Sequence, residues 1–244
     1  MRELCFYIFR ESREELTFVL IGALGSGKSS TGNSILGHKQ FKVSTGTIAV
    51  TDRVESESVS RNGLKITVVD TPGLKNVSSF LEIKHNIDLL HINKPNNIIY
   101  LITIKIGRYT NEERVILDNI FKNHRAMMKN AMIIFTNNGE LMDEDDPADQ
   151  NVDEWIRKNP TLLRLKNDNK LKYCAFENKR STPEENDTQV RYLLSVVHNF
   201  DKKDVSWNRN MENKICVDKE TMVETFGQCG RTFFEEQILK QNNK

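Results

Sequence analysis

The chain lacks several features that would place it in a membrane or an oxidising compartment. Its longest strongly apolar stretch, residues 98–106, is too short to span a bilayer and already contains Lys105. The four cysteines form no CxxC pair, so they predict reduced thiols rather than a disulfide framework. We therefore expect a cytoplasmic protein with no integral membrane segment.

An excess of charge of either sign is also missing. The 35 basic residues are balanced by 34 acidic residues, which leaves a net charge of +1. A nucleic-acid or anionic-membrane partner would favour a marked basic excess. The balance therefore predicts small-molecule and protein partners, with no nucleic acid among them.

Apolar segments alternate with amphipathic ones along most of the chain. Residues 16–22 form a continuous apolar run that leads into a glycine-rich turn, as expected of a strand buried on both faces. Asn62 and Gly63 favour a tight hairpin, so the strands on either side of them should be antiparallel. Capping boxes at Thr110 and Thr182 open two helices. The expected strands are residues 16–22, 50–60, 64–69, 97–104, 131–135 and 171–176.

This alternation predicts an α/β fold of three layers, with a wound, mostly parallel sheet and one antiparallel strand. Ligands bind such sheets outside the carboxyl ends of the strands. We expect an N-terminal arm at residues 1–14, a nucleotide-binding domain at 15–203 and a helical extension at 204–244, where Gly227 and Gly230 interrupt a weaker helical pattern.

The segment from Gly22 to Ser29 matches the phosphate-binding pattern G-x-x-x-x-G-K-[ST] between an expected strand and an expected helix. Glycines allow successive backbone N–H groups to surround a phosphate, and the helix directs its positive end to the same place. The alternative is an ordinary glycine turn with a surface lysine, which would not require a strand before it and a helix after it. The predicted phosphate-binding residues are Gly25, Ser26, Gly27, Lys28, Ser29 and Ser30.

A second motif, Asp70-Thr71-Pro72-Gly73, ends another expected strand. A buried aspartate needs a cation, and Mg²⁺ held jointly with Ser29 supplies one. Gly73 brings an N–H group toward the terminal phosphate without a side chain in the way. In nucleotide-dependent switch proteins one threonine, here called the switch threonine, closes on Mg²⁺ and the terminal phosphate in the triphosphate state. Spacing alone leaves Thr45, Thr47 and Thr51 as alternatives for this residue.

Several stretches resemble the immunity-associated GTPases, which are kin to the septin and chloroplast-import GTPases. They are GALGSGKSSTGNSILG at residues 22–37, DTPG at 70–73, IGRYTNEE at 106–113 and CAFEN at 174–178. The resemblance implies a Ras-like P-loop NTPase core with extra C-terminal helices, GTP or GDP as ligand, and Mg²⁺. It also implies that Thr51 is the switch threonine and a metal ligand beside Ser29 and Asp70.

The base-reading motif departs from the usual NKxD pattern. Residues 136–141 read TNNGEL, so Glu140 falls where the guanine-reading carboxylate belongs. A carboxylate accepts the N1–H and amine of guanine and repels N1 of adenine. Asn137 and Asn138 complete the predicted base loop, although Asn138 replaces the lysine that usually covers the base, and Asn178 should lie beside the base. A turn without a ligand role is the alternative for Glu140 and Asn178.

Two functional readings remain open from the sequence. Leu74 stands where Ras-type proteins carry a water-orienting glutamine. One reading is a slow GTPase stimulated by dimerisation, with Arg108 as an arginine finger on a neighbouring subunit; otherwise Arg108 pairs with Glu112 or Glu113 on its own surface. The other reading is a GTP-gated oligomerising scaffold with negligible hydrolysis. The candidate catalytic residues are Lys28, Thr51, Gly73 and Arg108.

Both readings predict a homo-dimer or oligomer formed through the nucleotide face. A helical stripe after Gly73 carries apolar residues that either pack in the core or meet a partner. Its members are Phe80, Ile83, Ile87 and Leu90.

Overall fold

The computed structural model describes residues 15–43, 53–61, 64–89, 97–143, 151–179 and 181–198. Thr51, its rivals Thr45 and Thr47, and the hairpin turn at Asn62 and Gly63 lie outside these residues. So do the predicted N-terminal arm and C-terminal extension, and the division at residues 14 and 203 therefore stays a prediction.

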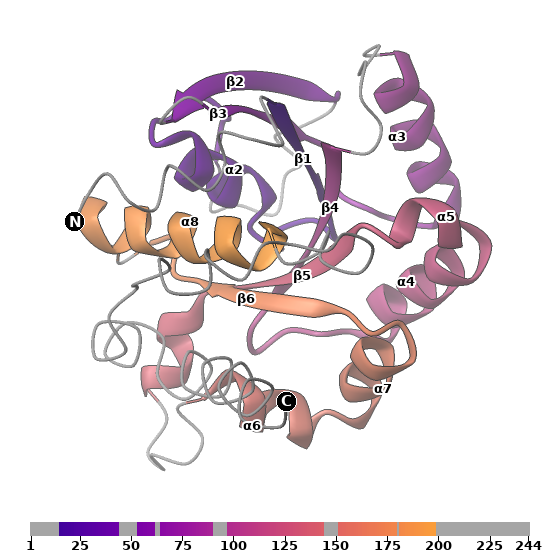
Figure 1. Ribbon diagram of the computed structural model, residues 1–244. Helices are drawn as coiled ribbons and strands as arrows, with labels where there is room; N and C mark the ends of the chain where they lie inside the picture. The colour runs from indigo at the N-terminus through magenta and orange to yellow at the C-terminus, as the bar shows by residue number, and fades with distance from the viewer. Residues whose placement is uncertain are drawn as a thin grey trace, which may run out of the picture.

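Six strands form one sheet in the order β2-β3-β1-β4-β5-β6 (Figure 1). All neighbours are parallel except β2 and β3, which are antiparallel, with Glu55 opposite Asp70 and Arg61 opposite Leu64. This confirms the mostly parallel sheet with one antiparallel strand. The strands are β1 (Glu15–Ile21), β2 (Glu55–Arg61), β3 (Leu64–Asp70), β4 (Ile98–Lys105), β5 (Ala131–Thr136) and β6 (Lys172–Phe176).

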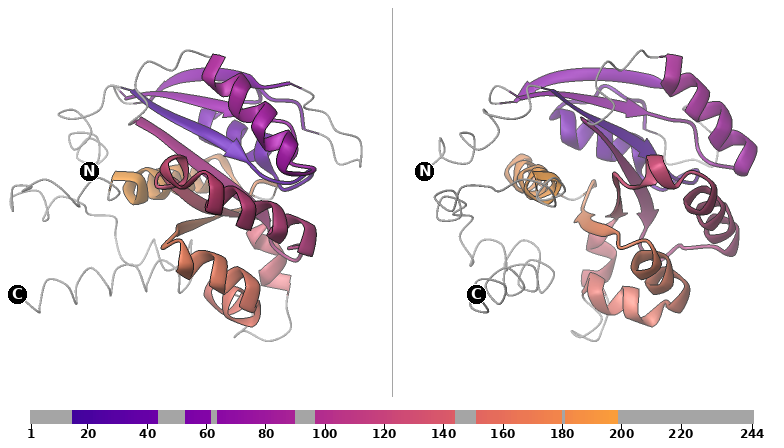
Figure 2. Two further views of the ribbon diagram at one scale, coloured as in Figure 1. Left: turned by 90° about the vertical axis from the view of Figure 1, so that its right-hand side faces the viewer. Right: turned by 45° about the vertical axis from the view of Figure 1, so that its right-hand side comes forward.

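Helices cover both faces of this sheet and complete three layers (Figures 1 and 2). On one face lie α2 (Lys28–Leu36) and α8 (Pro183–His198). The other face carries α3 (Val77–Leu89), α4 (Asn111–Asn123), α5 (Arg125–Met128), α6 (Val152–Lys158) and α7 (Pro160–Asp168). A short 3₁₀ helix, η2 (Asn138–Asp143), follows β5.

Strand β1 shows why the apolar run in the sequence is continuous. Successive side chains of a strand point to opposite faces, and both faces here are covered by helices. Phe18 and Leu20 join the core beneath α2 and α8, whereas Val19 and Ile21 join the core beneath α3 and α4. Burial on both faces keeps the strand end, and the loop that follows it, in one position.

The apolar stripe on α3 belongs to the core. Phe80, Ile83 and Ile87 are at most 4% exposed and pack in the same cluster as residues of β1 and β4. Core packing is therefore the outcome for these residues, while Leu90 lies outside the described part of the chain.

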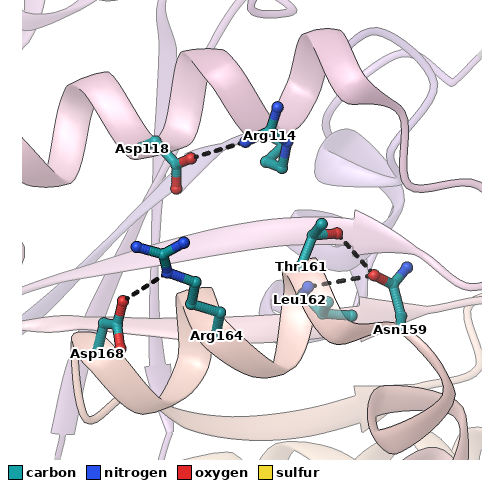
Figure 3. Close-up of polar contacts among 7 residues, drawn as sticks. All are labelled: Arg114, Asp118, Asn159, Thr161, Leu162, Arg164 and Asp168. Carbon is teal, nitrogen blue, oxygen red and sulfur yellow. Dashed lines mark hydrogen bonds and ion pairs between the residues drawn. The ribbon is translucent and has the colours of Figure 1, made fainter.

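The sequence reading missed α6 and α7, although both begin at ordinary capping residues. The side chain of Asn159 accepts hydrogen bonds from Leu162 N at 3.2 Å and Thr161 Oγ1 at 2.7 Å (Figure 3). Asn151 caps α6 by accepting hydrogen bonds from the backbone N–H groups of Asp153 and Glu154. An asparagine that accepts from the first free N–H groups of a helix is a common start signal. These caps were the local signal that could have revealed both helices.

Exposed ion pairs line the surfaces of α4 and α7, which pack beside each other. Arg114 pairs with Asp118 and Arg164 with Asp168, each one helical turn apart (Figure 3). Such exposed pairs contribute little to stability, roughly 0.3–0.5 kcal/mol each.

In the described part of the chain, no helix has both the length and the apolar character needed to cross a membrane. Cys174 is buried and is not part of a disulfide, and the other three cysteines lie outside that part.

Candidate nucleotide-binding site

The glycine-rich loop connects β1 to α2 at the carboxyl end of the sheet. Gly25 (φ 75°) and Gly27 (φ 92°) adopt left-handed conformations that side-chain-bearing residues rarely take. A Cβ atom at Gly27 would also lie 3.0 Å from the side chain of Thr136. These two glycines are therefore required by the backbone path, and the path leads into the amino end of a nine-residue helix. This is a backbone suited to hold an anion.

Two threonines from neighbouring strands hold the loop in shape. Thr103 Oγ1 lies 2.6 Å from Ser26 Oγ, and Thr136 Oγ1 donates to the Ser26 carbonyl at 2.8 Å. Ser26 is only 2% exposed, so its side chain serves the loop rather than a ligand. The sequence reading placed Ser26 at the site but missed Thr103 and Thr136. Their only local signal was a threonine near the carboxyl end of an apolar strand.

Lys28 lies folded over the loop and is 6% exposed. Its Nζ donates to the carbonyls of Gly22 at 3.2 Å and Ala23 at 2.9 Å. Burial lowers the pKa of Lys28 to about 8, while the charges of Asp70 and Glu113 oppose this shift. A buried lysine of this kind would interact more favourably with an anionic ligand than a solvated lysine would, because the ligand phosphate would compensate the desolvation of the ammonium group.

Ser29 and Asp70 meet at the mouth of the loop. Ser29 Oγ donates to Asp70 Oδ2 at 2.7 Å, and Asp70 is fully buried at the end of β3. A hydroxyl and a carboxylate are hard oxygen donors that suit Mg²⁺, which takes its remaining ligands from phosphates and water. No group of three His, Cys, Asp or Glu side chains that could hold a metal occurs in the described residues. Ser30 follows on α2 and is half-buried.

The segment after Asp70 lies directly against the phosphate loop. Leu74 N donates to the Gly22 carbonyl at 2.9 Å, and a Cβ atom at Gly73 would lie 2.9 Å from the backbone of Leu24. Glycine is therefore needed at residue 73 for this close approach. Leu74 is 6% exposed and carries no polar group, so it cannot orient water.

Arg108 reaches the phosphate loop from a tight turn after β4. Arg108 N donates to the Lys105 carbonyl at 3.1 Å, and Gly107 (φ 77°) makes the turn possible. Arg108 is exposed, and its Nη1 lies 3.7 Å from the position of a Cβ atom at Gly25. Within the described residues Arg108 forms no ion pair with Glu112 or Glu113, so the alternative of a surface pairing is not observed there.

The base loop starts at Asn137, which has a left-handed backbone (φ 60°) and is 8% exposed. Its Nδ2 donates to Glu140 Oε1 at 2.8 Å, and its carbonyl accepts from Glu140 N at 3.0 Å. Lys105 Nζ lies 3.4 Å from the same Glu140 oxygen. Asn138 and Glu140 are both in η2 and half-buried, so the structure brings the predicted base-loop residues together at the end of β5.

Glu177 joins this loop to the loop after β6. Its Oε2 accepts from Gly139 N at 2.6 Å, and its Oε1 accepts from Lys179 N at 2.9 Å. Gln189 on α8 in turn accepts from Glu177 N at 2.6 Å. The sequence reading missed this role, since nothing near Glu177 in the chain indicates which loop its carboxylate reaches.

The side chain of Asn178 is directed to α2. It donates to Thr31 Oγ1 at 2.9 Å and accepts from Ser34 Oγ at 3.0 Å. These bonds tie the loop after β6 to the helix that starts at the phosphate site. A contact between Asn178 and a base stays a prediction.

The fold and the loop define the class: this is a P-loop NTPase fold with a phosphate site between β1 and α2. The chain belongs to the AIG1 family, whose sequence profile matches residues 16–226. It is 34% identical over 189 residues to human GTPase IMAP family member 8, covering 76% of this chain and 28% of that protein. It is 30% identical over 196 residues to immune-associated nucleotide-binding protein 9 of Arabidopsis thaliana, covering 79% of this chain and 57% of that protein.

The chain spans only 26–31% of the length of the rat, mouse and human IMAP family member 8 proteins that it matches. Among solved structures, Toc33 of Arabidopsis thaliana with Mg²⁺ and GMPPNP superposes with a TM-score of 0.62 at 18% identity, over 82% of this chain and 91% of that chain. A Toc33 variant described as a dimerization-deficient mutant gives a TM-score of 0.61 at 17% identity, over 82% and 91% of the two chains. This likeness confirms the predicted fold.

Proposed function

We propose that this protein is a GTP-binding switch that slowly hydrolyses GTP to GDP and phosphate with Mg²⁺, and that dimerisation accelerates the reaction. The observation that carries the proposal is the phosphate loop itself, with buried Lys28 over it and the Ser29–Asp70 pair at its mouth. The names of the IMAP and Toc33 relatives, which describe GTPases and nucleotide complexes, support the same reading.

The residues divide the work by their chemistry. Lys28 supplies a positive charge to the phosphate oxygens, and Ser29 and Asp70 would hold the metal, which would neutralise charge that develops on the phosphates. The backbone N–H groups of Gly25, Ser26 and Gly27 would line the phosphates. Gly73 would bring its N–H group to the terminal phosphate, and Thr51 is proposed as the switch threonine.

Guanine selectivity is proposed to come from Glu140. Its carboxylate would accept both the N1–H group and the amine of guanine, whereas N1 of adenine is itself an acceptor. Asn137 holds Glu140 in the loop, as the 2.8 Å bond between them indicates. Asn138 lacks the long stem that would cover the base, so we expect a weaker base interaction than a lysine would provide.

The deciding experiment compares binding of fluorescent GTP and ATP by the wild type, Lys28→Ala and Glu140→Ala. We expect loss of both nucleotides in Lys28→Ala and a reduced guanine preference in Glu140→Ala. If the wild type binds GTP and ATP equally, the guanine assignment is wrong. If it binds neither, the whole proposal is wrong.

Arg108 is proposed to act on the nucleotide of a partner copy across the nucleotide face. Its exposed position beside Gly25 and its freedom from ion pairs within the described residues support this role. Dimerization is important for the GTPase activity of the chloroplast translocon components atToc33 and psToc159. Specific activity should then rise with protein concentration, and Arg108→Ala should abolish the rise. Arg125→Ala, which removes an exposed arginine of α5, is the matched control. Turnover that does not depend on concentration would contradict the role in trans.

A second candidate function is a GTP-gated oligomerising scaffold with negligible hydrolysis. The buried, apolar Leu74 favours it, because no side chain there can orient water. Light scattering with a non-hydrolysable GTP analogue and with GDP measures assembly directly. Assembly with the analogue and no phosphate release from GTP would favour the scaffold over the enzyme.

The cytoplasmic location and the three-part division of the chain are further proposals. Limited proteolysis with mass spectrometry should leave a resistant core near residues 15–203, with cleavage before and after it. Cleavage at equal rates inside the described strands would contradict that division.

A further inference from the structure

One lysine outside the predicted base loop contacts its key carboxylate. Lys105 is the last residue of β4 and pairs in register with Thr136, the last residue of β5. Its Nζ lies 3.4 Å from Glu140 Oε1, the oxygen that also accepts from Asn137 Nδ2 at 2.8 Å. A hydrogen bond from Asn137 and an ion pair with Lys105, which lie on different elements, therefore hold one oxygen of this carboxylate.

The turn after Lys105 leaves space for the same carboxylate. Gly107 has a left-handed backbone, and a Cβ atom there would lie 3.2 Å from Glu140 Oε2. Any side chain at residue 107 would crowd the carboxylate. Within the described residues, Oε2 accepts no hydrogen bond, so it remains available to a ligand.

Glu177, the other carboxylate near the base loop, is placed differently. Both of its oxygens accept backbone N–H groups, from Gly139 and from Lys179. It therefore shapes the two loops that flank the base site. Glu140, by contrast, is oriented by two side chains, the amide of Asn137 and the ammonium of Lys105.

We propose that Lys105 is a positioning residue for guanine selectivity and acts through Glu140. It holds Oε1 so that the carboxylate presents a fixed edge to the base, and it supplies beside the base loop the positive charge that Asn138 does not provide. The inference rests on the proposed role of Glu140 in reading guanine. Because the pair is partly exposed, its effect should be modest and expressed as orientation.

A comparison of GTP with inosine triphosphate (ITP) separates the effect of carboxylate orientation from the contribution of the rest of the site. ITP shares the phosphates, the ribose and the N1–H group of GTP but lacks the exocyclic amine. The ratio of GTP affinity to ITP affinity therefore measures how well one carboxylate accepts two N–H groups at once. A general loosening of the fold or of the phosphate loop would weaken both nucleotides and leave the ratio unchanged.

The test measures this ratio for the wild type, Lys105→Ala, Lys105→Gln, Lys105→Arg, Glu140→Ala and the Lys105→Ala/Glu140→Ala double variant. We expect both the alanine and the glutamine variants to lower the ratio about fivefold and arginine to restore it, since arginine keeps the charge. In the Glu140→Ala background, Lys105→Ala should cause no further change. Lys84→Ala, which removes the exposed Lys84–Asp88 pair on α3, is the control and should leave the ratio unchanged.

Two outcomes overturn the inference, and they are distinguishable. If Glu140→Ala lowers the ratio while Lys105→Ala and Lys105→Gln leave it unchanged or raise it, Lys105 does not position the carboxylate and the base-reading role of Glu140 stands. If Glu140→Ala leaves the ratio unchanged, the base-reading role fails and the inference fails with it.

Discussion

The phosphate end of the candidate site depends on backbone conformation and buried side chains, whereas the base end depends on partly exposed side chains. At the phosphate end, left-handed glycines and buried side chains set the geometry, and Lys28 and Asp70 are 6% and 0% exposed. At the base end, partly exposed side chains set the geometry: the Lys105 side chain is 29% exposed and the Glu140 side chain is 42% exposed. A site fixed by backbone tolerates few substitutions, whereas a site made of exposed side chains can change one residue at a time.

This difference explains where the sequence departs from the usual pattern. The phosphate loop keeps every expected residue, because its glycines are needed for backbone conformations that other residues reach only with strain. The base loop has Asn138 in place of lysine and Glu140 in place of aspartate. A cation from the neighbouring strand β4 lies beside it instead. The comparison can be tested by changing each end separately.

The largest effect should come from Lys28→Ala at the phosphate end. Loss of a buried ammonium that faces a polyphosphate should weaken nucleotide binding by at least about 100-fold, or roughly 2.7 kcal/mol. Isothermal calorimetry with GTP and GDP measures it, and Lys84→Ala on α3 is the matched control. Affinity within threefold of the wild type would show that the phosphate end does not depend on this buried charge.

A pH effect should follow from the same residue. The pKa of Lys28 falls from 10.5 to about 8 on folding, so the unfolded chain binds more protons between those pH values. Stability of the nucleotide-free protein should therefore rise across this window, by up to about 3 kcal/mol, and the rise should be absent in Lys28→Met. Denaturant unfolding at pH 7.5, 9 and 10.5 measures the free energy of unfolding of the wild type and of Lys28→Met.

Nucleotide affinity should change in the opposite direction. Binding of a polyphosphate requires the ammonium form, so affinity should fall about twentyfold between pH 7.5 and 9.5. Calorimetry in two buffers of different ionisation enthalpy should show proton uptake on binding near pH 8. Absence of proton uptake at this pH would mean that Lys28 is already fully charged in the free protein.

A smaller effect is expected from Asp70→Asn. The amide keeps the size of the side chain but removes the charge that would attract Mg²⁺ next to Ser29, so affinity for Mg²⁺–GTP should fall about tenfold. Affinity without Mg²⁺ should change much less. Asp118→Asn on the surface of α4 is the control, and titration of GTP at several Mg²⁺ concentrations measures all three proteins. An equal loss with and without Mg²⁺ would indicate a structural role only.

The smallest effect on nucleotide binding should come from Asn178→Ala. Its hydrogen bonds to Thr31 and Ser34 connect the loop after β6 to α2, so their loss should lower the free energy of unfolding by about 1–2 kcal/mol. The preference for GTP over ATP should stay within twofold if the side chain serves α2. Thermal and denaturant unfolding, with nucleotide binding alongside, measure both quantities. A large loss of base preference with unchanged stability would instead favour the predicted contact with the base.

Much of the fold could be predicted because its signals are local. The apolar run of β1, the glycines before Lys28 and the capping box at Thr110 each depend on residues a few positions apart. The start of α7 at Asn159 was missed although its signal was also local. The Ser26–Thr103 and Gly139–Glu177 contacts join residues 77 and 38 positions apart, and no pattern in the chain links them.

The sequence by itself determined the alternation of strands and helices and the position of the glycine-rich loop. These depend on side-chain periodicity and on backbone conformations that only glycine adopts easily, and both are properties of short segments. Only the tertiary structure decided that Lys105 lies beside Glu140, that Arg108 reaches Gly25 and that Glu177 joins two loops. Such meetings depend on which strands are neighbours and in which register, and that is settled by the packing of the whole sheet.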